Sequence, residues 1–170
     1  MNGGENVSVT KIRSYWESGA LIFADLIGNV LMKLDPDTAR VEMPSNRKIA
    51  KVALTAGNAN AYAFAWQNPE ASKVIVEKVL VNLGTAGGTA NAVLDVGVVA
   101  NATSTADTLI DGLDLNTTGL FDNFVDIGTN GKSRALVDEK GGTNDYVTGK
   151  ILVANAAALA GDVYIIYFTV

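Results

Sequence analysis

Residues 92–134 limit what this chain can fold into more than any other stretch. Short apolar runs alternate there with clusters of Asp, Asn, Gly and Thr, and no helical period persists for three turns. Short apolar runs separated by turn-forming residues are typical of strands that follow one another through tight turns. The stretch therefore predicts an antiparallel β protein.

The composition indicates a folded domain with little catalytic equipment. The chain has 170 residues, of which 48% are hydrophobic and 18% charged, and a chain of this length buries about 70% of its unfolded surface. It contains no cysteine and no histidine, which removes disulfides, thiolate ligands, the commonest general base and the commonest metal ligand. We therefore expect a protein that is not an enzyme and that needs no cofactor.

The charge and the apolar runs exclude two further classes of partner. The formal net charge of −5 speaks against nucleic acid, which proteins bind through basic patches. No apolar run approaches the roughly 18 residues that a membrane-spanning helix requires, so we expect no membrane partner. Residues 1–6 lack the basic and apolar segments of a secretory signal, which predicts that the protein folds in a cytoplasm.

Local composition divides the chain into three parts. Residues 1–19 are predicted to form an extended N-terminal arm, residues 20–47 a β-hairpin with a linker, and residues 48–170 a β-sandwich. The hairpin is expected because two apolar runs flank Gly28 and Asn29, residues that readily adopt the positive φ of a hairpin turn.

The arm carries an aromatic pair in an otherwise polar setting. Tyr15 and Trp16 are adjacent, and burying a large aromatic side chain is worth a few kcal/mol. One interpretation is that Trp16 packs on its own domain. The other is that the arm reaches a neighbouring subunit or another protein, with Lys11, Arg13, Tyr15 and Trp16 as the partner-binding residues.

Strands from Ile49 onward predict the architecture of the main part. Ala alternates with aromatics over residues 61–66, and period two would place the aromatics on one face and the alanines on the other. The last run, residues 163–170, is apolar on both faces, as in a central or interface strand. The apolar face of residues 73–83 changes near Glu77 and Lys78, which predicts a bulge or a bend. About eight strands predict an all-β fold, an antiparallel two-sheet sandwich of jelly-roll type. The candidate subunit-interface residues are Ala61, Ala63, Ala65, Tyr164, Ile166 and Phe168.

Two motifs resemble binding sites and favour a simpler interpretation. Gly131, Lys132 and Ser133 match the end of a phosphate-binding loop, but the position of its first glycine is Asp126, so we interpret them as a turn. A second motif is an acidic cluster that could offer oxygen ligands to calcium, although its spacing fits no EF-hand. We favour the alternative that these carboxylates cap turns. The cluster consists of Asp111, Asp114, Asp122 and Asp126.

Several strand-and-turn phrases carry a family resemblance. They are WQNP at 66–69, DVG at 95–97, LIDGLD at 109–114, FDN at 121–123, GTNGK at 128–132 and YVTG at 146–149. With these phrases the chain resembles structural proteins of tailed bacteriophages, of the capsid decoration (cement) and head-fibre kind. Residues 1–50 lie outside the resemblance, and no catalytic residue belongs to it.

The resemblance implies a virion protein with a β-sandwich fold that assembles as a homotrimer. Its implied partner is the major capsid protein, and its implied location is the capsid surface, after synthesis in the cytoplasm of the host bacterium. An alternative is a head-fibre or tail-associated module that binds a host receptor or glycan. A third is a carbohydrate-binding β-sandwich unrelated to viruses.

Overall fold

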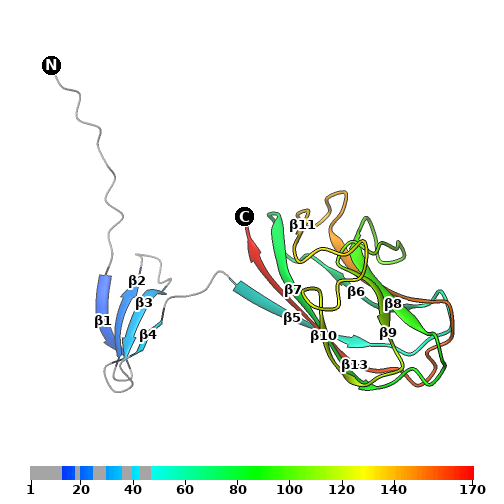
Figure 1. Cartoon of the computed structure of the whole chain (residues 1–170). Helices are drawn as coiled ribbons and strands as arrows, with labels where there is room; N and C mark the ends of the chain where they lie inside the picture. The colour runs from blue at the N-terminus through cyan, green and yellow to red at the C-terminus, as the bar shows by residue number, and fades with distance from the viewer. Residues whose placement is uncertain (1–12, 18–19, 25–29, 36–39, 43–46) are drawn as a thin grey trace. The chain divides into compact units, whose positions relative to one another are not determined.

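The protein folds into strands in two separate units. The computed structural model describes residues 13–17, 20–24, 30–35, 40–42 and 47–170. Contacts divide the chain into Met1–Asn46, here called the N-terminal unit, and Arg47–Val170, here called the body (Figure 1). Every strand pair in the described ranges is antiparallel, and these ranges contain no helix. The fold is therefore all-β, as the sequence predicts.

The N-terminal unit is a four-stranded sheet in the order β1-β2-β3-β4. Its strands are β1 (Arg13–Glu17), β2 (Ala20–Ala24), β3 (Val30–Asp35) and β4 (Arg40–Glu42). β2 and β3 form the predicted hairpin, whereas β1 corrects the expectation of an extended arm, since it pairs with β2 along its whole length. The alternation in β1 explains the pairing, because it places Tyr15 beside the buried Ile22. Residues 1–12, the hairpin turn and the linker at 44–46 lie outside the described residues.

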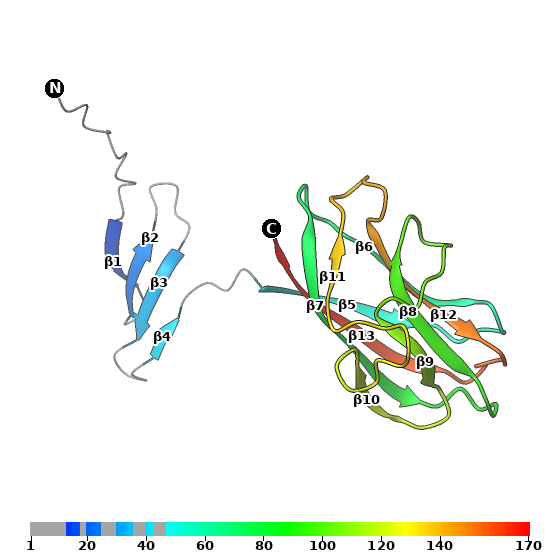
Figure 2. The same ribbon diagram turned by 45° about the horizontal axis from the view of Figure 1, so that its top comes forward.

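The body consists of two antiparallel sheets (Figures 1 and 2). One, the β7 sheet, has the order β10-β7-β13-β5, with β11 also pairing with β7; the other, the β12 sheet, has the order β6-β12-β8-β9. The strands are β5 (Arg47–Leu54), β6 (Tyr62–Gln67), β7 (Val74–Thr85), β8 (Val93–Val99), β9 (Ile110–Asp114), β10 (Gly119–Asp122), β11 (Ala135–Val137), β12 (Tyr146–Leu152) and β13 (Ala160–Thr169).

Both sheets of the body contribute to one hydrophobic core. Val81 of β7 and Ile165 of β13 are fully buried together with Leu94 of β8 in the opposite sheet. The ring of Trp66 on β6 lies 5.0 Å, centroid to centroid, from that of Tyr167 on β13. Each fully buried aliphatic side chain contributes about 1.5–3 kcal/mol. Two sheets that share a core in this way are consistent with a β-sandwich.

β13 occupies the centre of the β7 sheet, as its apolar character on both faces predicts. It pairs with β5 on one side and with β7 on the other. Its register with β7 shifts after Ile166, which pairs with Lys78. Tyr167 then pairs with Val76, so Glu77 has no pairing residue on β13. Of the bulge and the bend predicted near Glu77, this irregularity is the bulge.

A second irregularity changes the faces of β6. The register of β12 with β6 shifts between Gly149, which pairs with Phe64, and Lys150, which pairs with Tyr62. Ala63 and Phe64 are consequently both buried, and the predicted uniform separation of alanines from aromatics is wrong. A Cβ on Gly149 would lie 2.2 Å from the Phe64 ring, so the ring occupies space that only glycine leaves free.

Candidate assembly surface

The outer side of the β7 sheet carries three of the residues that the sequence singled out. Val163, Ile165 and Tyr167 of β13 are buried in the core. Successive side chains of a strand point to opposite faces, so the residues between them lie on the outer side, where each is partly exposed. These outer residues are Tyr164, Ile166 and Phe168.

Neighbouring strands extend this apolar surface. Ile49 on β5 lies beside Ile166 and is 68% exposed. On the far side, Leu120 of β10 and Leu136 of β11 are 66% and 53% exposed. We call the set the outer face; it comprises Ile49, Ile75, Leu80, Leu120, Leu136, Tyr164, Ile166 and Phe168. An exposed apolar surface of this kind usually marks an interaction site.

The charged side chains on the same side of the sheet are paired with one another. The Lys51 ammonium lies 3.0 Å from Asp162, and the Lys78 ammonium lies 2.8 Å from Asp122. Arg47 donates two hydrogen bonds to the Glu77 carboxylate, and this contact lowers the pKa of Glu77. Such exposed pairs contribute little to stability by themselves. They do leave the outer face with few unmatched charges that a covering partner would have to desolvate.

The N-terminal candidates lie on one strand, except Lys11, which is outside the described residues. Arg13, Tyr15 and Trp16 belong to β1. Tyr15 packs against a small cluster of buried residues on β2, whereas Trp16 is 67% exposed and pairs with Leu21. Alternation along the strand places these two aromatics on opposite faces of the sheet.

The alanine candidates do not form a surface. Ala63 is fully buried in the core, and Ala61 packs against that core. Ala65 is partly exposed. Ala63 is therefore inaccessible to a second subunit, because the bulge between β6 and β12 turns its side chain inward.

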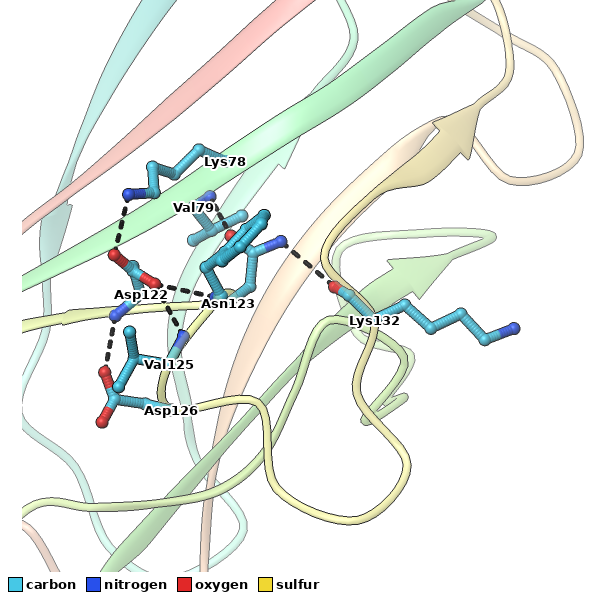
Figure 3. A network of polar contacts seen from close by, with 8 residues as sticks. Lys78, Val79, Asp122, Asn123, Val125, Asp126 and Lys132 are labelled. Atoms are coloured by element: carbon cyan, nitrogen blue, oxygen red, sulfur yellow. Dashed lines mark hydrogen bonds and ion pairs between the residues drawn. The ribbon is translucent and has the colours of Figure 1, made fainter.

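The acidic cluster is occupied by turn hydrogen bonds (Figure 3). Asp122 accepts hydrogen bonds from the backbone N–H groups of Phe124 and Val125 at 2.7 and 3.0 Å, in addition to its ion pair with Lys78. The Asp126 carboxylate accepts one from the backbone N–H of Asp122 at 2.9 Å. Both carboxylates therefore hold the turn that follows β10.

The two remaining members of the cluster have the same role. Asp111 accepts a hydrogen bond from the backbone N–H of Asn130 at 3.0 Å, and Asp114 accepts one from that of Asn116 at 2.9 Å. Among the residues that the structure describes, no three acidic side chains lie close enough together to hold a metal ion. The local hydrogen bonds match the turn-capping interpretation of the cluster.

Asn123 is an organising residue that sequence reasoning missed. Its side chain is fully buried, accepts a hydrogen bond from the backbone N–H of Val79 at 2.8 Å, and donates one to the carbonyl of Lys132 at 3.1 Å. Figure 3 shows it between β7 and the segment that leads to β11. An asparagine within a turn-rich stretch gives no sequence signal that separates this role from ordinary turn formation.

Asp95 of β8 is a buried carboxylate with one hydrogen bond, from the backbone N–H of Gly112 at 2.9 Å. Burial raises the pKa of the Asp95 carboxyl, and the charges of Asp111 and Asp107 raise it further, against the effect of that hydrogen bond. A raised pKa means that ionisation is less favourable in the folded protein than in the unfolded chain.

Comparison with known protein families, with curated proteins and with solved structures gives no match to this chain. Within the described ranges, no helix is long and apolar enough to cross a membrane.

We expect Asn123→Ala to destabilise the body by about 2–4 kcal/mol, because it removes the side-chain partner of the buried Val79 N–H and of the Lys132 carbonyl. Chemical denaturation monitored by tryptophan fluorescence measures this change in the free energy of unfolding. Asn58→Ala is the matched control, since Asn58 is exposed and its side chain makes no hydrogen bond in the described part of the chain. Equal effects of the two substitutions would contradict the organising role of Asn123.

We expect Asp95→Asn to stabilise the protein at pH 7 and to have little effect near pH 3. The pKa of Asp95 is higher in the folded protein than in the unfolded chain. The contribution of its protonated carboxyl to stability is therefore complete below the unfolded-state pKa of about 3.9 and is lost as the pH rises through the folded-state pKa. Denaturation midpoints measured from pH 3 to 7 test this expectation.

Asp138→Asn should give the opposite trend. The ion pair with Lys73 lowers the pKa of Asp138, so the wild-type carboxylate stabilises the fold above the unfolded pKa, and this contribution disappears as the pH falls. Stability changes of the same sign in both variants at pH 7 would contradict the expectation for Asp95.

Proposed function

We propose that this protein is a structural virion protein of a tailed bacteriophage, which binds the outer surface of the capsid as a homotrimer and stabilises it. The observation that carries the proposal is the outer face, an exposed apolar surface whose neighbouring charges are already paired. No buried side-chain polar atom in the described residues lacks a hydrogen-bond partner, as suits a rigid building block. The phage setting comes from the phrases that resemble decoration and head-fibre proteins.

The strand pairing supports a jelly-roll body as part of this proposal. The strands pair in a nested order, β5 with β13, β6 with β12, β7 with β10 and β11, and β8 with β9. A long antiparallel hairpin that rolls up into two sheets produces this nesting. Jelly rolls with eight strands in two sheets are common in viral capsids.

The dimensions of the outer face bear on how the copies would associate. Ten residues of β13 span about 33 Å, and four strands span about 19 Å, which gives roughly 600 Å². A stable interface buries about 800 Å² on each partner. The outer face would therefore supply most of one subunit contact, and another part of the chain would supply the rest.

We assign contact with the capsid to the N-terminal unit. Trp16 is 67% exposed, and tryptophan and arginine are the residues most enriched at the energetic centres of interfaces. The register places Trp16, Leu21, Leu34 and Val41 in one row across the four strands. Trp16 and the neighbouring Leu21, with Lys11 and Arg13 nearby in the sequence, would bind the shell.

We expect the wild-type protein to sediment as a trimer and Ile49→Lys to sediment as a protomer, because a lysine on the outer face would have to lose its hydration on assembly. Sedimentation velocity measures both states. Val153→Lys is the matched control, since Val153 is 75% exposed and lies outside the outer face. A monomeric wild type, or dissociation by both substitutions alike, would contradict the assembly role.

Copy number separates decoration from the head-fibre or tail-associated alternative. We expect hundreds of copies in each virion, because decoration proteins occupy repeated positions on the shell. Densitometry of a virion gel against the major capsid band gives the number. A value of only a few copies would instead indicate a receptor-binding or tail module.

A further inference from the structure

The body carries an open groove beside β11, which shares Leu136 with the outer face and none of its other members. Its volume is about 470 Å³, within the range of about 300–1,000 Å³ that is usual for small-molecule sites. The residues that matter for its chemistry are Val98, Lys132, Arg134, Leu136, Asp138 and Asn144.

The groove gathers two cations, Lys132 and Arg134; Arg134 interacts electrostatically with Glu77, a carboxylate that Arg47 already binds. Five cations of the body are held in ion pairs, and the Lys150 ammonium lies over the Tyr62 ring. Of the cations in residues 47–170, only Lys132, Arg134 and Lys140 have neither an ion pair nor an aromatic ring contact. Lys132 and Arg134 both line the groove and are exposed. Figure 3 shows the Lys132 side chain directed away from the turn network that binds its carbonyl.

Polar and apolar groups complete the lining. Asp138 accepts hydrogen bonds from the Lys73 ammonium at 2.8 Å and from the backbone N–H of Asn144 at 3.0 Å. The ion pair balances the charge of Asp138, while the carboxylate keeps lone pairs that can accept from hydroxyl groups. The Asn144 side chain makes no hydrogen bond within the described residues, and Leu136 offers an exposed apolar wall.

We propose that this groove binds an acidic sugar residue. Arg134 and Lys132 would hold the sugar carboxylate, since charge-assisted hydrogen bonds to guanidinium are strong and directional. Asp138 and Asn144 would bind its hydroxyl groups, and the C–H face of the ring would pack on Leu136. A bare phosphate fits less well, because it has no C–H face to pack on Leu136. Such a site goes beyond capsid stabilisation, because it would attach the protein to an acidic polysaccharide.

Titration of the full-length protein with trigalacturonic acid, followed by heteronuclear NMR, tests the proposal. Its methyl ester is the neutral control ligand. Chemical shift changes should concentrate at residues 132–138 and 144 and should be absent with the ester. Arg134→Gln should weaken binding about tenfold, as the loss of one charge-assisted contact does. Lys140→Gln is the matched control: it removes a cation outside the groove and should change the affinity less than about twofold.

Three results would overturn the proposal. The first is the absence of localised shift changes, and the second is equal weakening by Arg134→Gln and Lys140→Gln, which would indicate non-specific charge attraction. The third is equal or tighter binding of a triglutamate peptide or of inorganic phosphate at the same residues, which would show that the groove recognises negative charge alone. The NMR spectrum of each variant also establishes that it remains folded.

Discussion

The apolar character of both faces of β13 is the constraint on which the rest of the structure depends. Its inward side chains, such as Ile165, pack against the β12 sheet and form the core. Its outward side chains, such as Ile166, lie in a surface that also includes Ile49. One strand therefore links folding to the proposed assembly, because the hydrophobic effect that closes the sandwich also favours covering its outer side.

Polar side chains in this protein serve mainly to hold backbone. Asn68 is fully buried and donates to the carbonyls of Ser72 and Asp138, while Asp145 accepts from Gln67 and from the backbone of Gly141. Such contacts replace the regular ladder where strands end. Contacts of the same kind account for the acidic cluster of residues 111–126, which resembles a cation site in the sequence.

Much of the fold could be predicted because period-two patterns and turn residues are local signals. β8 occupies the predicted residues 93–99, and the bulge at Glu77 follows from a change of apolar face. The pairing of β1 and the bulge at Gly149 could not be predicted, since alternation indicates a face but not a neighbour. The groove was missed for the same reason, because Arg134 and Asn144 meet only in the folded chain. The phage assignment remains a prediction.

The interruption between β10 and β11 bears on how copies of the protein can add to one another. Both short strands pair with the same side of β7, and the Asn123 side chain binds the Val79 N–H in the gap between them. An unpaired strand edge is a template for edge-to-edge pairing and growth into fibrils. The short strands β10 and β11, with the Asn123 side chain between them, cover this edge of β7 and block such growth on one side of the sheet. In the proposed assembly, copies would therefore associate through broad faces, which can form closed rings of fixed size.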